Sequence, residues 1–252
     1  MYRGRRIAVV VPAFNEADKI ARTIRSIPGF VDHVIVVDDG SADATLRLAS
    51  RSQRRGLEVL RHARNRGVGA AIATGYARAH ELDVDVTAVM AGDSQMDPAD
   101  LATLVGTVVS DQADYAKGNR FAWPGVTRVM PTSRLVGNVV LSLLTRLATG
   151  YDQLFDSQCG YTAVNRRALG AVLAGPLFAR YGYPNDLLAR LRAVDARVMD
   201  VPVRPVYGPG WRSGIRIPGV ILPLSFLLGR AFLQRLRRGL TRLRAVLRPR
   251  PL

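Results

Sequence analysis

Cysteine and lysine are scarce in this 252-residue sequence, which has one cysteine, Cys159, and only two lysines, Lys19 and Lys117. A single cysteine excludes a framework of internal disulfides and fits a reducing compartment. No apolar run reaches the ~18 residues of a membrane-spanning helix, so no transmembrane segment is predicted. The basic residues 1–6 precede only the short apolar run Ile7–Val11, so no secretory signal peptide is predicted.

Two glycine motifs of nucleotide-binding proteins are also missing. No G-x-x-x-x-G-K sequence occurs, which excludes a Walker-type phosphate loop. No G-x-G-x-x-G sequence follows the first apolar run, which argues against a dinucleotide-binding domain.

Four apolar residues, Val34–Val37, run directly into Asp38 and Asp39. Such a run is typical of a strand that is buried on both faces of a parallel sheet. The carboxyl end of such a strand is where open α/β sheets bind ligands. Adjacent acids there are unfavourable without a partner, so we expect the pair to meet a polar ligand. A turn and a helix cap are the favoured explanation for three residues that follow, Ser41, Asp43 and Thr45.

Apolar strand patterns alternate with helical patterns over the first 120 residues. This alternation predicts a mostly parallel sheet with helices on both faces and right-handed crossovers. The predicted strands are Ile7–Val11, with Pro12 stopping the strand, His33–Val37, Leu57–Leu60, Val84–Met90 and Asp114–Lys117. The predicted helices are Glu16–Ile27, Ala42–Gln53, Gly69–His80 and Asp100–Val109.

Three glycines, Gly67, Gly69 and Gly75, stand among small residues just before and within the predicted helix Gly69–His80. They allow another part of the backbone, or a ligand, to approach closely. Close packing of helix on sheet explains them at least as well as phosphate binding.

The pattern changes after residue 121. A loop is predicted for Phe121–Thr132, followed by a helix at Ser133–Thr149 and a polar turn at Asp152–Tyr161. Further helices are predicted at Ala168–Leu173 and Pro184–Val194, a strand at Arg197–Val203, and a glycine-rich loop at Tyr207–Gly214.

The C-terminal region is strongly basic. Residues 201–252 contain 11 arginines and no lysine or acidic residue, and so carry +11 of the net charge of +16. The apolar stretch Ile215–Leu228, interrupted by Pro218 and Pro223, precedes the predicted amphipathic basic helix Gly229–Leu247. This order is typical of a segment that lies on an anionic membrane surface. Packing on the protein itself or on a second subunit, as in a homodimer, is the alternative. A nucleic-acid partner is disfavoured because aromatic residues are not interleaved with the charges.

Polar groups follow three of the predicted parallel strands, at Pro12–Glu16, Asp38-Asp39 and Asp93. The carboxyl ends of parallel strands lie at one edge of the sheet, so these groups should converge. Carboxylates there suit sugar hydroxyls and a divalent cation such as Mg²⁺ or Mn²⁺, which would bridge to a diphosphate. Arg120, after the next strand, has the fork geometry that suits phosphate. The three histidines, His33, His62 and His80, lack metal-ligand spacing and are predicted to be core or solvated residues.

Five ordered motifs resemble the family 2 glycosyltransferases, most closely the dolichyl- or polyprenyl-phosphate sugar synthases. They are VVPAFNE (10–16), VVDDGSADAT (36–45), NRGVGAA (65–71), GDSQMDP (92–98) and GNR (118–120). The resemblance implies the GT-A fold, a Rossmann-like mixed sheet that is mostly parallel, over residues 1–214. The basic region 215–252 would follow it as a helical tail. The resemblance also implies inverting transfer of a sugar from a UDP- or GDP-linked donor to a polyprenyl phosphate. The enzyme would be a peripheral protein on the cytoplasmic face of the cell membrane.

The resemblance also implies roles for individual residues. The donor would be held by Pro12, Ala13, Glu16, Asp38, Asp39 and Asp93, and the metal by Asp93 and Gln95. Phosphates would meet Arg120, Arg134, Arg212 and Ser213. The catalytic carboxyl groups would be Asp186 and Asp156, with Asp156 on the acceptor side.

Two departures from the family pattern affect these roles. Ala91 replaces the first aspartate of the metal-binding D-x-D segment, and Gly214 replaces a lysine, so that Arg212 or Arg216 would supply the charge. A lipid phosphate acceptor is already anionic and needs no base, whereas a hydroxyl acceptor would need an acid such as Asp186 to take its proton. One alternative is therefore a soluble enzyme that glycosylates a hydroxyl. A second alternative, suggested by Ala91, is a non-catalytic protein that binds a nucleotide sugar.

Overall fold

The computed structural model describes residues 1–207 and the helix at residues 217–246, in which side chains are described for 222–238 and 240. The predicted phosphate-binding residues Arg212 and Ser213, with Gly214 and Arg216, lie outside the described residues.

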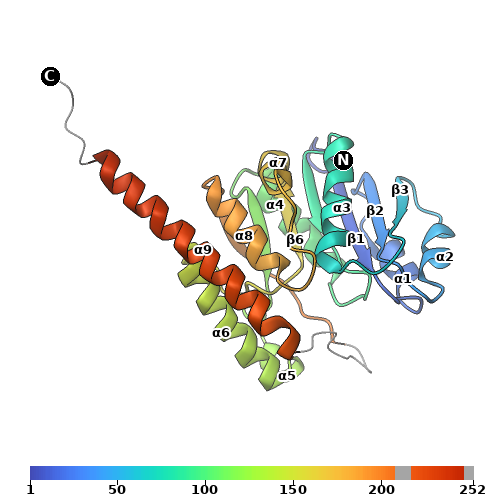
Figure 1. Cartoon of the computed structure of the whole chain (residues 1–252). Coiled ribbons are helices and arrows are strands. Elements are labelled where there is room, and N and C mark those ends of the chain that lie inside the picture. The colour runs from blue at the N-terminus through green and yellow to red at the C-terminus, as the bar shows by residue number, and fades with distance from the viewer. Residues whose placement is uncertain (208–216, 247–252) are drawn as a thin grey trace.

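A seven-stranded sheet forms the centre of the molecule (Figure 1), in the order β3-β2-β1-β4-β6-β5-β7. Neighbouring strands are parallel except at β6, which is antiparallel to both β4 and β5. The fold is therefore the mixed, mostly parallel GT-A-like sheet that the motifs predict. The strands are β1 Ile7–Ala13, β2 His33–Asp38, β3 Leu57–Arg61, β4 Val86–Val89, β5 Tyr115–Asn119, β6 Thr162–Asn165 and β7 Val198–Pro202.

Helices cover both faces of the sheet, as the alternating pattern predicts. Alternate residues of β1 point to opposite faces, so that Val9 packs in the same cluster as Ile20 and Leu104, whereas Val10 packs in the same cluster as Ile72. Because both faces are covered, the strands are apolar throughout rather than alternating. The helices are α1 Ile20–Ser26, α2 Thr45–Ser50, α3 Val68–Glu81, α4 Leu101–Val109, α5 Val126–Val129, α6 Thr132–Thr149, α7 Arg166–Leu173, α8 Tyr183–Ala193 and α9 Ile217–Val246.

Pro12 does not end the first strand, contrary to the prediction. β1 continues to Ala13 and pairs with β2 as far as Asp38. The carbonyl of Pro12 faces the β4 side and accepts a bond from the Gly92 amide, whereas the β1–β4 ladder ends at Val10. The nitrogen of Pro12 points to the same side as its carbonyl, so its missing N–H removes no bond of the β1–β2 ladder.

The strand β6 was not predicted. Its four residues Thr162–Asn165 are too few to show a periodicity, and they run directly into α7. The strand exists because it fills the gap between β4 and β5 and pairs with both. This pairing is a property of the assembled sheet.

The predicted break between an apolar stretch and a basic helix is wrong. Both belong to α9, one helix of 30 residues that continues through Pro223. A proline inside a helix loses one backbone hydrogen bond, but α9 packs along α6 and α8, and Leu227 and Ala231 are buried. Figure 1 shows α9 beside α6 at one end of the sheet. Of the helices in the described residues, none combines the length and apolar character needed to cross a bilayer.

Candidate active site

A cleft of about 1580 Å³ opens at the carboxyl ends of β1, β2 and β4. These three strands are parallel neighbours in the sheet, so their ends form one row. The predicted convergence is therefore present in the structure. The predicted residues that line the cleft are Pro12, Ala13, Glu16, Asp39, Asp93, Gln95 and Arg134.

Asp93 lies in the turn that follows β4. Its Oδ1 accepts a hydrogen bond from the backbone N–H of Gln95 at 3.0 Å. Thr23 of α1 fixes the same turn by donating to the carbonyl of the residue before Asp93 at 3.1 Å. Burial raises the pKa of Asp93, and the positive charges of Lys19 and Arg134 act in the opposite direction. The turn thus presents one carboxylate, close to two cations, at the cleft wall.

A second carboxylate of the cleft, Glu16, is paired with a lysine that the motifs did not single out. Lys19 Nζ lies 2.9 Å from Glu16 Oε2. Burial raises the pKa of Glu16, Lys19 lowers it, and the nearby charge of Asp93 raises it again. Two carboxylates that repel each other in one cleft favour a bound cation or a protonated partner. The spacing of Glu16 and Lys19, three positions apart, was the signal that could have indicated this pair.

The loop after β1 is held by the turn after β2. Thr45 Oγ1 accepts from the Glu16 amide at 2.7 Å, and Asp43 accepts from the amides of Ala17 at 3.2 Å and Thr45 at 2.9 Å. The Asn15 amide donates to Ser41 Oγ at 2.9 Å. These turn residues therefore shape the cleft from behind, in agreement with the predicted turn. The N-cap residue of α2 is Ala44, so the predicted cap at Asp43 is one residue too early.

The two adjacent acids Asp38 and Asp39 have different surroundings. Asp39 is buried at the cleft wall and accepts bonds from His62 Nδ1 at 2.7 Å and from the amides of Arg66 and Gly67 at 2.9 and 2.7 Å. Asp38 is fully buried and does not line the cleft. Its Oδ1 has no hydrogen-bond partner among the described residues.

His62 and the glycines hold Asp39 and α3 in place. His62 is buried, as expected of a core histidine, and its Nε2 lies 2.9 Å from Thr74 Oγ1. Gly75 packs directly on β1, because a Cβ there would lie 2.3 Å from Val10 Cγ1. Close helix–sheet packing therefore accounts for Gly75.

The metal-binding role can be tested on the residues around Asp93. The described residues contain no group of three or more His, Cys, Asp or Glu side chains that could hold a metal ion. Ala91 lines the cleft but offers no side-chain ligand. A hard divalent cation can nevertheless bind through one or two carboxylates when substrate phosphates supply other ligands. Asp93 fits that arrangement.

Arg120 and Asp156 form a buried pair outside the cleft lining. Arg120 Nε and Nη2 lie 2.7 and 2.9 Å from the two carboxylate oxygens of Asp156, and the Arg120 amide adds a third bond at 3.1 Å. Asp156 is fully buried, and although burial raises its pKa, the guanidinium lowers it below its ordinary value. Asp156 therefore holds Arg120 at the end of β5, which leaves its predicted acceptor-side role a prediction.

Asp186 also lies outside the cleft lining. It is buried in the first turn of α8, where Oδ2 accepts from the Phe178 amide at 3.0 Å and from Arg190 Nε at 3.1 Å. Its Oδ1 accepts from Arg230 of α9. These partners occupy both oxygens of the predicted proton acceptor.

Asp200 of β7, near Asp156, is a half-buried acid with an unusual environment. Its Oδ2 accepts from the Phe155 amide at 2.6 Å, while Oδ1 has no partner in the described part of the chain. Burial raises the pKa of Asp200 to about 6, although the nearby Lys117 acts in the opposite direction. Because the folded-state pKa exceeds the ordinary 3.8, this group stabilises the fold fully below 3.8, and that contribution is lost as the pH rises through about 6.

Replacing Asp200 by asparagine is therefore expected to raise the free energy of unfolding at pH 8 by about 2 kcal/mol, since a charge that partial burial disfavours is removed. The gain should shrink as the pH falls from 8 to 4.5. Urea unfolding of both proteins across this range measures it, with the exposed Asp152→Asn as the control. A gain in the free energy of unfolding that is the same at every pH would contradict the inference that ionisation of Asp200 destabilises the fold.

Later segments of the chain add residues to the cleft that were not predicted. Arg180 and Tyr181, from the segment before α8, and Arg204, after β7, line it. No sequence motif marks them, because they reach the cleft only when the segments after the central strands fold over the sheet.

Comparison with known proteins agrees with this geometry. The sequence model of "Glycosyl transferase family 2" matches residues 8–173. A UDP-N-acetylglucosamine–dolichyl-phosphate N-acetylglucosaminyltransferase of Methanococcus voltae is 30% identical over 217 residues, which cover 80% of this chain and 86% of that protein. An undecaprenyl-phosphate mannosyltransferase of Micrococcus luteus is 28% identical over 203 residues, covering 79% and 82%.

The fold also matches solved structures. The crystal structure of glucosyl-3-phosphoglycerate synthase from Mycobacterium tuberculosis, in complex with Mn²⁺, UDP and glucosyl-3-phosphoglycerate, superposes with a TM-score of 0.68 and 23% identity. The match covers 92% of this chain and 80% of that one. The fold, the convergent acids of the cleft and the match over residues 8–173 together show that the chain belongs to glycosyl transferase family 2 and is a glycosyltransferase.

Proposed function

We propose that this glycosyltransferase moves a sugar from a UDP- or GDP-linked donor to a polyprenyl phosphate, with inversion at the sugar C1. The observation that carries the proposal is the position of α6. Arg134, in its first turn, lines the cleft that holds Asp93, and the helix then runs away from the cleft with exposed apolar residues along its length. A cleft for a charged donor thus continues into a surface that suits an isoprenoid chain.

The apolar surface is formed by two helices that pack side by side. A membrane surface, rather than a water-soluble glycan, is the partner that would cover it. We call this surface the apolar face; its exposed members are Val136, Val139, Val140, Leu143, Leu144 and Leu147 of α6, and Leu222, Phe226, Phe232, Leu233, Leu236 and Leu240 of α9.

Two similar proteins support the lipid acceptor, since their names describe transfer to dolichyl phosphate and undecaprenyl phosphate. The basic residues of α9, which include Arg235 and Arg237, add attraction to anionic lipids. We therefore place the protein on the inner face of the cell membrane, bound at its surface through α6 and α9.

The reaction requires little covalent chemistry from the protein itself. A phosphate oxygen of the acceptor attacks C1 in line, the new C1–O bond forms, and the bond from C1 to the nucleoside diphosphate breaks. The acceptor oxygen is already anionic, so no side chain has to remove a proton, which agrees with the occupied oxygens of Asp186. Lys19 and Arg134 lie at the cleft wall where negative charge grows on the leaving diphosphate.

A divalent cation, Mg²⁺ or Mn²⁺, would neutralise part of the charge on the diphosphate. Asp93, with Gln95, would hold it, and the phosphates of the donor would complete its ligands. Asp39, with Pro12 and Ala13 at the end of β1 and Glu16 in the loop after it, would hold the nucleoside part.

The test is a transfer assay with the full chain, a panel of UDP- and GDP-sugars, Mn²⁺ or Mg²⁺, and polyprenyl phosphate in vesicles. Sugar recovered as a phosphodiester-linked lipid supports the proposal. Transfer only to water-soluble hydroxyl acceptors, or donor binding without turnover on any acceptor, would contradict it.

Introducing charge on the apolar face is expected to separate lipid binding from donor chemistry. Val140→Glu with Leu147→Glu should lower the fraction of protein that floats with anionic vesicles at least tenfold, because exposed apolar surface is lost to a charged group. The donor affinity should stay within twofold. Val194→Glu, at an exposed apolar residue at the end of α8, is the matched control. Equal flotation of both variants would contradict the assignment of this face.

A further inference from the structure

The segment between α7 and α8, residues 174–182, covers the start of α3 and reaches the cleft. The carbonyl of Ala179 accepts from the Ala70 amide at 3.0 Å, and a Cβ at Gly69 would lie only 2.0 Å from the Phe178 carbonyl oxygen. Arg180 and Tyr181 of this segment line the cleft. Arg180 is exposed, and its guanidinium makes no hydrogen bond or ion pair with any described residue, so its charge faces solvent at the cleft. The position of the segment therefore shapes one wall of the donor site.

Two residues of α8 hold this segment. Asp186 Oδ2 accepts from the Phe178 amide at 3.0 Å and from Arg190 Nε at 3.1 Å. Arg190 donates in turn to the carbonyls of Val172 at 3.2 Å and Gly175 at 2.9 Å, and also to that of Pro176. The backbone of the segment is thus tied to one carboxylate–guanidinium pair.

The helix α9 completes this arrangement from outside. Arg230 Nη2 donates to Asp186 Oδ1, and Asp186 is only 2% exposed. Leu227, one turn earlier in α9, is buried against the end of the segment, since a Cβ at Gly182 would lie 2.6 Å from Leu227 Cδ1. A buried carboxylate is tolerable only with such partners. The anion that fixes the segment therefore depends on a residue of α9.

We propose that Arg230 is a positioning residue for donor binding, which acts through Asp186 on the segment 174–182. The inference rests on the proposed function, because the cleft that the segment lines is the donor site. The ion pair of Arg230 and Asp186 couples the docking of α9 to the shape of the donor cleft. Asp186, in this arrangement, supports the site and does not take a proton from the acceptor.

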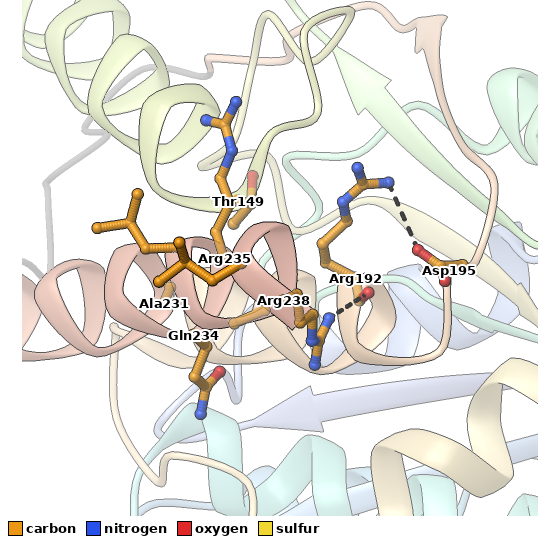
Figure 2. A pocket seen from close by; sticks show the side chains of 10 residues that line it. Thr149, Arg192, Asp195, Ala231, Gln234, Arg235 and Arg238 are labelled. Carbon is orange, nitrogen blue, oxygen red and sulfur yellow. Dashed lines mark hydrogen bonds and ion pairs between the residues drawn. The ribbon is translucent and has the colours of Figure 1, made fainter. Parts of the chain in front are cut away.

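Other arginines of α9 provide matched controls. Arg235 Nη1 donates to the Leu147 carbonyl of α6 at 2.6 Å, and Arg238 Nη1 donates to the Arg192 carbonyl at the end of α8 at 2.6 Å. Figure 2 shows Arg235 and Arg238 around a second cavity of about 410 Å³ between these helices. They attach α9 to its neighbours without an interaction with the segment 174–182.

The experiment measures the affinity of the full chain for UDP and for GDP with Mn²⁺, by calorimetry. Arg230→Gln is expected to weaken the nucleotide that the wild type binds five- to tenfold, and to speed amide exchange in residues 174–182. Arg230→Lys keeps the charge and should recover at least half of the loss in log affinity. It also keeps the test possible if the glutamine variant does not fold. Arg235→Gln should bind within twofold of the wild type.

Wild-type affinity in Arg230→Gln, or an equal loss in Arg235→Gln, would overturn the inference. The proposed function fails separately. A wild type that binds neither UDP nor GDP would contradict the assignment of the donor cleft. A wild type that binds donor but transfers no sugar to polyprenyl phosphate would contradict the acceptor alone.

Discussion

Replacing Asp93 by asparagine is expected to lower the rate of sugar transfer about 10³-fold, the effect typical of removing one electrostatic stabiliser from an active site. Asparagine can still accept the bond that the Gln95 amide gives to Asp93 Oδ1, so the turn after β4 should keep its shape. What disappears is the negative charge that would hold a cation against the diphosphate. Steady-state transfer, with donor and acceptor both saturating, measures the effect.

Two companion measurements make this result specific to the site. The stabilisation of the folded chain by nucleoside diphosphate should lose its dependence on Mn²⁺ in the Asp93→Asn protein, since a ligand that binds only the folded state raises the unfolding midpoint. The exposed Asp152→Asn variant should keep the wild-type rate. Full activity in the Asp93→Asn protein would mean that the cleft is not the donor site.

The second large effect concerns stability. Replacing Asp156 by alanine is expected to lower the free energy of unfolding by about 3–5 kcal/mol, because the mostly buried guanidinium of Arg120 is left without its partner. For a chain of this size that corresponds to a fall of roughly 10 °C in Tm. Urea and thermal unfolding measure it directly.

A matched exposed pair and a double variant separate this pairing from a general loss of charge. Arg192 and Asp195 lie 3.9 Å apart with side chains 37% and 59% exposed. Asp195 has a left-handed backbone that asparagine also tolerates, so Asp195→Asn should cost less than about 1 kcal/mol. Adding Arg120→Met to Asp156→Ala should restore part of the loss, since the unpaired charge is then gone. A loss of unfolding free energy in Asp156→Ala that is as small as the loss in Asp195→Asn would contradict the stabilising role of the buried pair.

The sheet and its binding edge follow from local patterns. The runs Ile7–Val11 and Val34–Val37 are apolar at every position, and only a strand covered on both faces explains that. Asp39 and Asp93 each follow such a run, and the parallel order β2-β1-β4 then places them in one cleft. Residue order alone is enough for this result, because the ends of parallel strands always share an edge.

The strand β6 and the continuity of α9 depend on contacts between distant segments. Thr162–Asn165 becomes a strand only because β4 and β5 offer it two open edges. α9 passes Pro223 because its packing on α6 and α8 outweighs one lost backbone bond. The partners of each segment are distant in the sequence. Local residue preferences therefore predicted no strand at β6 and a break in α9.

The same distinction applies to the charged side chains. The chemistry of the carboxylates was visible in their positions along the chain, but their roles depend on neighbours far away in sequence. Asp186 meets Arg230 across 44 residues, and Asp156 meets Arg120 across 36. Linear order places an acid at the end of a strand or helix. Whether it faces a substrate or neutralises an arginine depends on which cation the folded chain brings to it, because a buried charge is stable only beside its partner.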